Sequence, residues 1–178
     1  MLSDKDLLTI ANQMGINNHI TACIYKNELL KQKIKPDTSY IINLEDENFE
    51  GFGSHYTLLT SMTNKRTGIL EWFYFDSTSG SPPKEVLIAT KQHFVPYNTK
   101  MIQSPRTNES CGYFCLGMLY TIHKFPYTFG EIYADAIVFL EMFEDLNEKK
   151  DDLRNEFILQ QFFQNKTDVD KKFVENIE

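Results

Sequence analysis

The stretch CGYFCLGMLYTIHK, residues 111–124, predicts a buried helix of about 14 residues. Upstream of it, residues 39–44, 54–62 and 69–75 are rich in the residue types that favour β-strands. The third of these stretches is apolar on both faces, so we expect it to be a central, buried strand of a sheet. Residues 64–68 predict a hairpin connection between the second and third stretches, because the final glycine tolerates a positive φ.

Helical signals lie on both sides of this sheet in the sequence. Ser3 and Asp6 predict a helix start, and Gly15 predicts where that helix ends. Pro83 predicts the start of another helix, and residues 131–163 are strongly helical and amphipathic. The order of helices, a mostly antiparallel sheet and further helices predicts an α+β fold.

The length of 178 residues suits one domain, and no repeat or linker divides the chain. We therefore expect a single domain over residues 1–178, with a helical C-terminal extension at about residues 129–178. Residues 99–103 are expected to add one more strand to the sheet.

The charge of the chain argues against nucleic acid as an obligate partner. The formal net charge is −7 and the basic residues are scattered, so we expect no surface that binds polyphosphate. The three cysteines, Cys23, Cys111 and Cys115, imply no disulfide framework and fit a reducing compartment. No signal peptide is visible, and no run approaches the roughly 20 apolar residues of a membrane span. We expect a soluble, intracellular protein that binds no membrane.

Cys111 is a candidate nucleophile because it falls in the first turn of the predicted helix. A thiol there faces N–H groups without intrahelical partners and the positive end of the helix dipole. Both favour the thiolate, which is the nucleophilic form of cysteine. Gly112 would leave room for a substrate backbone to approach. Taken alone, Cys111 is more simply explained as a small buried hydrophobe, which is the commoner fate of an intracellular cysteine.

A nucleophilic thiol needs a base, and histidine titrates closest to neutral pH. Of the four histidines, His55 starts a predicted strand directly after the sequence GFG at 51–53, a position that suits a cleft. His123 lies about three turns along the helix that carries the thiol, so it cannot reach the sulfur. His19 and His93 are expected at a turn and at a helix end. His55 is therefore the preferred base.

Two polar residues could complete a site with His55. Asp76 ends the strand that pairs with the strand begun by His55, so antiparallel pairing puts the two side by side. A carboxylate there would orient the imidazole. Gln103 precedes the loop before the helix, and its amide could donate to an oxyanion together with the Cys111 N–H. Each residue alone has a plainer explanation, Asp76 as a turn cap and Gln103 as a solvated strand end.

A metal-binding or other non-catalytic binding module is the alternative from a different class. Cys111, Cys115 and His123 could be a ligand set. The Cys-x-x-x-Cys spacing is poor for structural zinc, however, and no second pair exists. Cys115 and Cys23 are otherwise expected to lie in the core, because apolar residues flank both.

As a set, these residues resemble the adenovirus-type cysteine endopeptidases, which are related to the SUMO-type proteases that act on ubiquitin-like proteins. The likeness is carried by His55-Tyr56, Tyr74-Phe75-Asp76-Ser77, Gln103 and Ser110-Cys111-Gly112-Tyr113-Phe114-Cys115. The chain order His, Asp, Gln, Cys is that of this clan and not of papain. The closest likeness is to the maturation proteases of Maverick/Polinton elements and mavirus-type virophages, over about residues 1–125. It implies the adenain-like (permuted papain-like) fold, in which helices flank a central mixed, mostly antiparallel sheet.

The resemblance also implies a reaction. Cys111, His55 and Asp76 would form the triad of a cysteine endopeptidase, with Gln103 in the oxyanion hole. The substrate would be a viral structural precursor, the capsid protein above all, cut near small residues such as glycine.

The likeness extends to the expected substrate groove and to the cofactors. Gly51, Gly53, Tyr56 and Gly112 could bind the substrate in a narrow groove. The family usually has tryptophan after the catalytic histidine, and Tyr56 keeps an aromatic ring there without the indole N–H. The adenoviral enzyme is basic and uses DNA and a disulfide-linked peptide as cofactors. This acidic chain is expected to need neither, and we expect no metal.

A deconjugating protease for ubiquitin-like proteins shares the triad and the Gly-Gly preference, so it remains the alternative within the clan. A maturation protease would act as a monomer in the cytoplasmic viral factory of an infected host and would be packaged in the virion.

Overall fold

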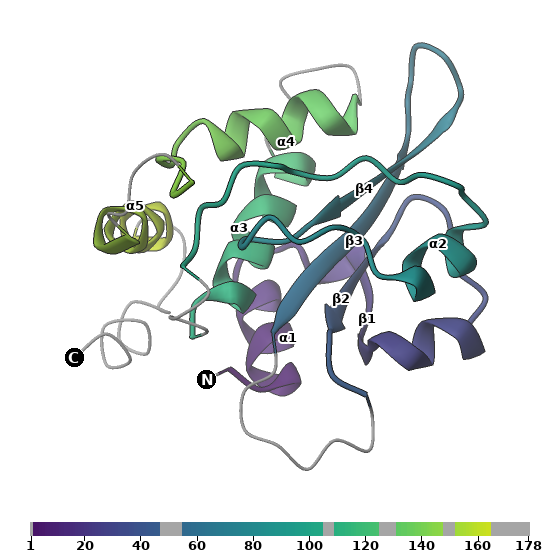
Figure 1. Ribbon diagram of the computed structural model, residues 1–178, viewed down its shortest axis with the longest axis horizontal. Coiled ribbons are helices and arrows are strands. Elements are labelled where there is room, and N and C mark those ends of the chain that lie inside the picture. Colours follow the sequence, from purple (N-terminus) through teal and green to yellow (C-terminus); the bar gives the residue numbers. More distant parts are fainter. Residues whose placement is uncertain (1, 47–54, 105–108, 125–130, 148–151, 165–178) are drawn as a thin grey trace.

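The computed structural model describes residues 2–46, 55–104, 109–124, 131–147 and 152–164 (Figure 1). Its α-helices are α1 (Asp4–Gln13), α2 (Lys84–Thr90), α3 (Cys111–Lys124), α4 (Ile132–Leu140) and α5 (Asp152–Gln164). Its 3-10 helices are η1 (Asn17–His19) and η2 (Lys26–Lys31). Its strands are β1 (Ile20–Tyr25), β2 (Ser39–Asn43), β3 (Tyr56–Thr63) and β4 (Leu70–Phe75).

The strands form a mixed sheet in the order β1-β2-β3-β4. β1 runs parallel to β2, whereas β2 with β3 and β3 with β4 are antiparallel. In Figure 1, α3 lies on one side of this sheet and α2 on the other. The predicted α+β class, with helices flanking a mixed, mostly antiparallel sheet, is confirmed.

Side chains alternate between two cores on opposite faces of the sheet. Leu58 and Leu59 of β3 are both fully buried, and they belong to different hydrophobic clusters. The first cluster includes the buried side chains of α3, and the second includes Leu29 of η2 and Val86 of α2. Because both faces are covered, consecutive residues of β2 and of the first part of β3 are buried, including threonine and serine side chains.

Helix α3 has the bounds that the sequence predicts, and its residues 111–119 are all buried. It packs against β3 and also contacts α1, α4 and α5. Aromatic rings from the C-terminal part of the chain cover it. Phe114 meets Phe143 edge-on with ring centroids 5.4 Å apart, and Tyr113 meets Phe163 at 5.7 Å. Such pairs contribute about 0.5–1.5 kcal/mol each beyond the burial of their area.

Local signals at the first helix and at the hairpin are confirmed. Ser3 caps α1, because its hydroxyl accepts the Asp6 N–H at 3.2 Å and the Asp6 carboxylate accepts the Ser3 N–H at 3.1 Å. Gly15 follows the helix end with φ of 68°, and Gly68 closes the β3–β4 turn with φ of 70°. Glycine adopts this left-handed conformation without a steric penalty.

The expectation that residues 69–75 form a central strand is wrong, because β4 lies at the edge of the described sheet. An irregular segment covers its outer side. The Tyr74 N–H donates to the Pro96 carbonyl at 2.8 Å, and Tyr74 forms an isolated parallel bridge with Tyr97. A run of consecutive apolar residues therefore indicates that both faces of a strand are covered. It does not indicate whether the strand has one neighbouring strand or two.

One other expectation on secondary structure needs correction. Residues 99–103 form no strand. The N–H groups of Ile102 and Gln103 both donate to the Ser77 carbonyl at 2.9 Å, so the segment bends around the end of β4. The helical character expected of residues 131–163 is present as two separate helices, because α4 ends at Leu140 and α5 begins at Asp152.

The remaining expectations concern the chain as a whole. None of the described helices is both long and apolar enough to cross a membrane. The single domain over residues 1–178, with its C-terminal extension at about residues 129–178, stays a prediction. Helices α4 and α5 lie within that extension, and both contact α3.

Candidate active site

The histidine and the aspartate that the sequence pairs lie at the same end of the β3–β4 hairpin. His55 directly precedes β3, and Asp76 directly follows β4. His55 Nε2 donates a hydrogen bond to Asp76 Oδ1 at 2.7 Å. The His55 side chain is 16% exposed and the Asp76 side chain 4% exposed, so the pair lies at the edge of the core.

The strand register places this pair diagonally and not directly opposite. Leu58 is opposite Phe75, so continuing the ladder by one step puts Asp76 opposite Thr57, two residues after His55. Long side chains reach across such diagonal positions in an antiparallel pair. The sequence therefore identified the right partners from an approximate register.

Asp76 is held by side chains that sequence reasoning missed. Thr78 donates both its N–H and its hydroxyl to Asp76 Oδ1, each at 2.8 Å. Asn98 brackets the Asp76 backbone, because its Oδ1 accepts the N–H at 3.0 Å and its Nδ2 donates to the carbonyl at 2.7 Å. Asn98 is 2% exposed and lies 22 residues along the chain, so no local pattern marks it.

Gly80 lies directly against the other oxygen of this carboxylate. A Cβ at Gly80 would lie 2.4 Å from Asp76 Oδ2 and 3.3 Å from its Cγ, closer than side chains approach one another. In the sequence, residues 76–83 are a polar stretch with one glycine and two prolines, and no pattern in it singles out Gly80. The absent side chain at Gly80 is what lets the loop fold back over Asp76.

Gly80→Ala is expected to lower kcat/KM by about 10- to 100-fold, because the new methyl group displaces the carboxylate that orients His55. Gly68→Ala is the matched control. Its φ of 70° gives it a backbone cost that Gly80 does not have, but nothing lies within 4 Å of its added Cβ. It should lower the melting temperature and leave kcat/KM unchanged. Wild-type kcat/KM in Gly80→Ala would contradict the role given to Asp76.

The contacts of the pair favour the charged form of both groups. Burial alone would lower the pKa of His55, but the hydrogen bond and charge of Asp76, together with Cys111, raise it to about 10. Burial likewise opposes ionisation of Asp76, yet His55 and the two Thr78 hydrogen bonds hold its pKa below its ordinary value. At neutral pH the pair is therefore an imidazolium beside a carboxylate.

Cys111 begins α3 and is 1% exposed. Its Sγ accepts the backbone N–H of Tyr56, the residue after His55, at 3.4 Å. His55 Nδ1, the ring nitrogen not bonded to Asp76, is buried and makes no regular hydrogen bond within the described residues. Since Cys111 also raises the pKa of His55, we infer that the thiol lies on the Nδ1 side of the ring.

Gln103 is 1% exposed, which rules out a solvated strand end. The Ser77 hydroxyl donates to Gln103 Oε1 at 2.5 Å, and this bond turns the amide nitrogen away from Ser77. Because Ser77 directly follows Asp76, one turn orients both the carboxylate and the amide. The role of Gln103 as an oxyanion donor stays a prediction.

The residues expected to bind substrate fall in different places. Gly51 and Gly53 lie outside the described residues. Tyr56 is 4% exposed, and its hydroxyl donates to an Asp4 carboxylate oxygen in α1 at 2.7 Å. A Cβ at Gly112 would lie only 2.7 Å from a methyl group of Leu7. The lack of a side chain at Gly112 thus lets α1 pack closely against α3. Contact between Gly112 and a substrate stays a prediction.

The other candidate residues do not form a second site. Cys115 is fully buried, as expected, whereas Cys23 is half-buried and packs against the edge of the core. Burial raises the pKa of the Cys115 thiol and raises that of Cys23 to about 12. His123 stacks on His19, with ring centroids 4.0 Å apart, at the far end of α3 from Cys111. In the described part of the chain, no three His, Cys, Asp or Glu side chains gather as a metal site would require.

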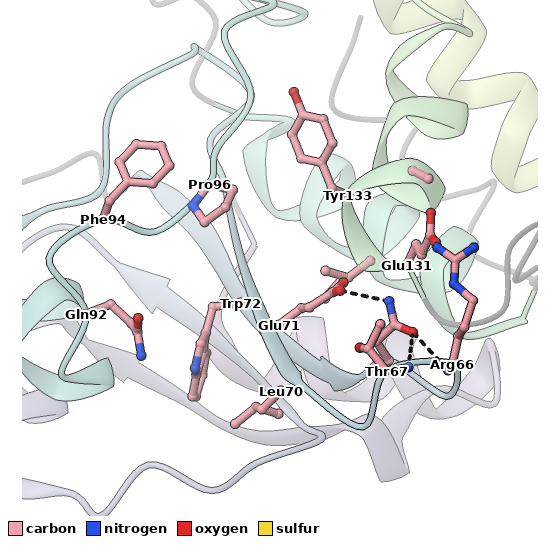
Figure 2. A pocket seen from close by; sticks show the side chains of 13 residues that line it. Arg66, Thr67, Leu70, Glu71, Trp72, Gln92, Phe94, Pro96, Glu131 and Tyr133 are labelled. Carbon is pink, nitrogen blue, oxygen red and sulfur yellow. Dashed lines mark hydrogen bonds and ion pairs between the residues drawn. The ribbon is translucent and has the colours of Figure 1, made fainter.

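A cavity of about 530 Å³ lies beside the β3–β4 turn, at the opposite end of these strands from His55. Figure 2 shows Trp72, Phe94 and Tyr133 among the side chains that line it. This cavity is separated from the candidate site by the length of β3, so it plays no part in the chemistry considered below.

Comparison with known proteins gives matches among solved structures alone. No family model matches the chain, and no curated protein does. One solved structure that matches is the ASFV pS273R protease, with a TM-score of 0.37 and 17% sequence identity. The match covers 68% of this chain and 44% of that protease, so the chain spans less than half of the length of the protease. At this level of similarity the match carries no weight for the activity.

Proposed function

We propose that this chain is a cysteine endopeptidase in which Cys111 is the nucleophile, His55 the base and Asp76 the residue that orients the base. The observation that carries this proposal is the arrangement around His55. Its Nε2 bonds to Asp76 at 2.7 Å, while Cys111 Sγ lies 3.4 Å from the backbone nitrogen of the next residue. The imidazole thus has a carboxylate on one nitrogen and a thiol toward the other, which is the arrangement that activates a nucleophile.

The reaction is peptide hydrolysis through a thioester. At neutral pH His55 Nδ1 already holds the Cys111 proton, as an imidazolium–thiolate ion pair, and the thiolate forms a bond to the scissile carbonyl carbon as the carbonyl π electrons move to the oxygen. The Cys111 N–H and the Gln103 amide donate to the oxyanion that develops. His55 then protonates the leaving amine as the peptide bond breaks, and water hydrolyses the thioester to regenerate the thiol. Asp76 holds the ring and stabilises its charged form throughout.

The substrate is a viral structural precursor, most simply the capsid protein, cut near small residues such as glycine. Support for this finer part comes from the resemblance carried by His55-Tyr56, Asp76-Ser77, Gln103 and Cys111-Gly112. On this proposal the enzyme has the adenain-like fold, acts as a monomer in the infected cell and is packaged in the virion. The net charge of −7 favours activity without DNA.

Cleavage of defined peptides by the purified full chain tests this function. Peptides from viral structural precursors that contain Gly-Gly-X or Gly-X-Gly should be cut near the glycines. Leucine in place of the glycine before the cut should lower kcat/KM by about 100-fold, because a narrow groove excludes branched side chains. Added DNA should leave the rate unchanged. A folded chain that cleaves none of these peptides would contradict the endopeptidase.

Fusions of ubiquitin and of SUMO to a C-terminal reporter protein form the second arm of this experiment. The proposal expects their release to be slower than cleavage of the best glycine-containing peptide. Faster release of either fusion would replace the maturation protease with a deconjugating protease that uses the same triad.

A further inference from the structure

Helix α5 meets the candidate active site through two consecutive residues. Asn155 and Glu156 are buried, at 0% and 9% exposed. They form hydrogen bonds with Ile102 and Ser110, which lie 53 and 46 residues away in sequence. These two partners directly precede the predicted oxyanion donor and the predicted nucleophile. In Figure 1, α5 lies on the far side of α3 from the sheet.

Asn155 fixes α5 to the backbone ahead of Gln103. Its Nδ2 donates to the carbonyls of Ile102 at 3.0 Å and of Glu144 at 2.8 Å. Its Oδ1 accepts the Glu144 N–H at 2.8 Å. Both ends of this fully buried amide are engaged, so α5 cannot shift without leaving buried polar groups unsatisfied.

Glu156 fixes α5 to the residue ahead of Cys111. The Ser110 hydroxyl donates to Glu156 Oε2 at 2.5 Å. The Ser110 carbonyl accepts the Phe114 N–H at 3.0 Å, so Ser110 also closes the first turn of α3. A shift of Glu156 would therefore be passed to the helix turn that carries the thiol.

A role in stability alone does not explain why a glutamate occupies this buried position. Burial raises its pKa, the Ser110 hydrogen bond lowers it and the charge of Asp152 raises it, to about 7 overall. A carboxyl group whose pKa is raised by folding stabilises the folded state at pH values below its ordinary pKa. This contribution to the free energy of unfolding is lost as the pH rises through 7. At and above neutral pH, the buried carboxylate thus weakens the fold compared with a neutral side chain of similar size.

We propose that Glu156 is a positioning residue for Cys111, acting through Ser110 to fix the first turn of α3 relative to His55, while Asn155 anchors α5. This inference rests on the proposed function, since it concerns the same site. The C-terminal helix α5 is then a part of the catalytic framework and not an appendage to it.

Glu156→Leu and Glu156→Gln test the proposal. Both substitutions remove the negative charge, but only glutamine keeps an oxygen that accepts the Ser110 hydroxyl. Glu156→Leu should lower kcat about tenfold with little change in KM, and Glu156→Gln should stay within about twofold of wild type. Ser110→Ala should match Glu156→Leu, and the double variant should be no slower than either single variant.

The rate at which iodoacetamide alkylates Cys111 gives a readout that needs no substrate, and it should follow the same order. If the wild-type chain cleaves no peptide, the proposed function fails, and the alkylation rates still decide whether Glu156 positions the thiol. If peptides are cleaved but Glu156→Leu and Glu156→Gln have equal kcat and equal alkylation rates, Glu156 does not position Cys111. A lower melting temperature in Glu156→Leu, with kcat unchanged, would assign Glu156 a structural role only.

Discussion

Cys111→Ala is expected to abolish peptide cleavage, with kcat/KM falling by about 10⁴-fold or more, while the chain stays folded. The thiol is the only group in the proposed mechanism that forms a covalent bond to the substrate, so no neighbour can replace it. The structural cost is small, because the substitution removes one sulfur atom, which accepts the Tyr56 N–H at 3.4 Å, and leaves the helix backbone in place. Cleavage assays and thermal melts on the same preparation separate the two effects.

Cys115→Ala is the matched control for this loss. Cys115 lies one turn further along α3, is fully buried and is 3.5 Å from the Tyr56 carbonyl. Its replacement leaves a cavity of similar size in the same core, so its melting temperature should fall about as much as that of Cys111→Ala. Activity should remain. Cleavage by Cys111→Ala at the wild-type rate would remove Cys111 from the mechanism.

His55→Ala is expected to lower kcat/KM by about 10³-fold or more and to remove the selective reactivity of Cys111. In wild type, iodoacetamide should alkylate Cys111 faster than Cys23 and Cys115 at pH 6 to 7, because the charged imidazole stabilises a thiolate beside it. Burial raises the pKa of the other two thiols, that of Cys23 to about 12. Peptide mass spectrometry over a pH series measures all three rates in one sample.

The free energy of unfolding should depend on pH in a way that reflects the pair formed by His55 and Asp76. The pKa of His55 is raised to about 10, so its contribution is complete below about 6.5 and is lost as the pH rises through 10. The pKa of Asp76 is lowered, so its contribution is present above the ordinary value and is lost in acid. His55→Ala should therefore flatten the alkaline loss of stability seen in urea titrations of wild type.

Equal alkylation of the three cysteines in wild type would contradict the pairing of His55 with Cys111.

Much of the fold could be predicted because its signals are local. The bounds of α3, the capping box at Ser3, the left-handed Gly15 and the β3–β4 turn each depend on a few neighbouring residues. The edge position of β4 could not be predicted in this way. Its outer side is covered by Pro96, which is remote in sequence and has no strand pattern of its own.

The residues that could do chemistry can be identified from the amino-acid sequence: a thiol at a helix start, a histidine at a strand start and an aspartate at the paired strand end. How these residues are held depends on contacts that form only when the chain folds. Gly80, Asn98 and Glu156 act across gaps in the chain of 4, 22 and 46 residues, through a close contact or a hydrogen bond. Such contacts leave no periodic signal, because a buried polar group needs a partner in space and any part of the chain can supply it.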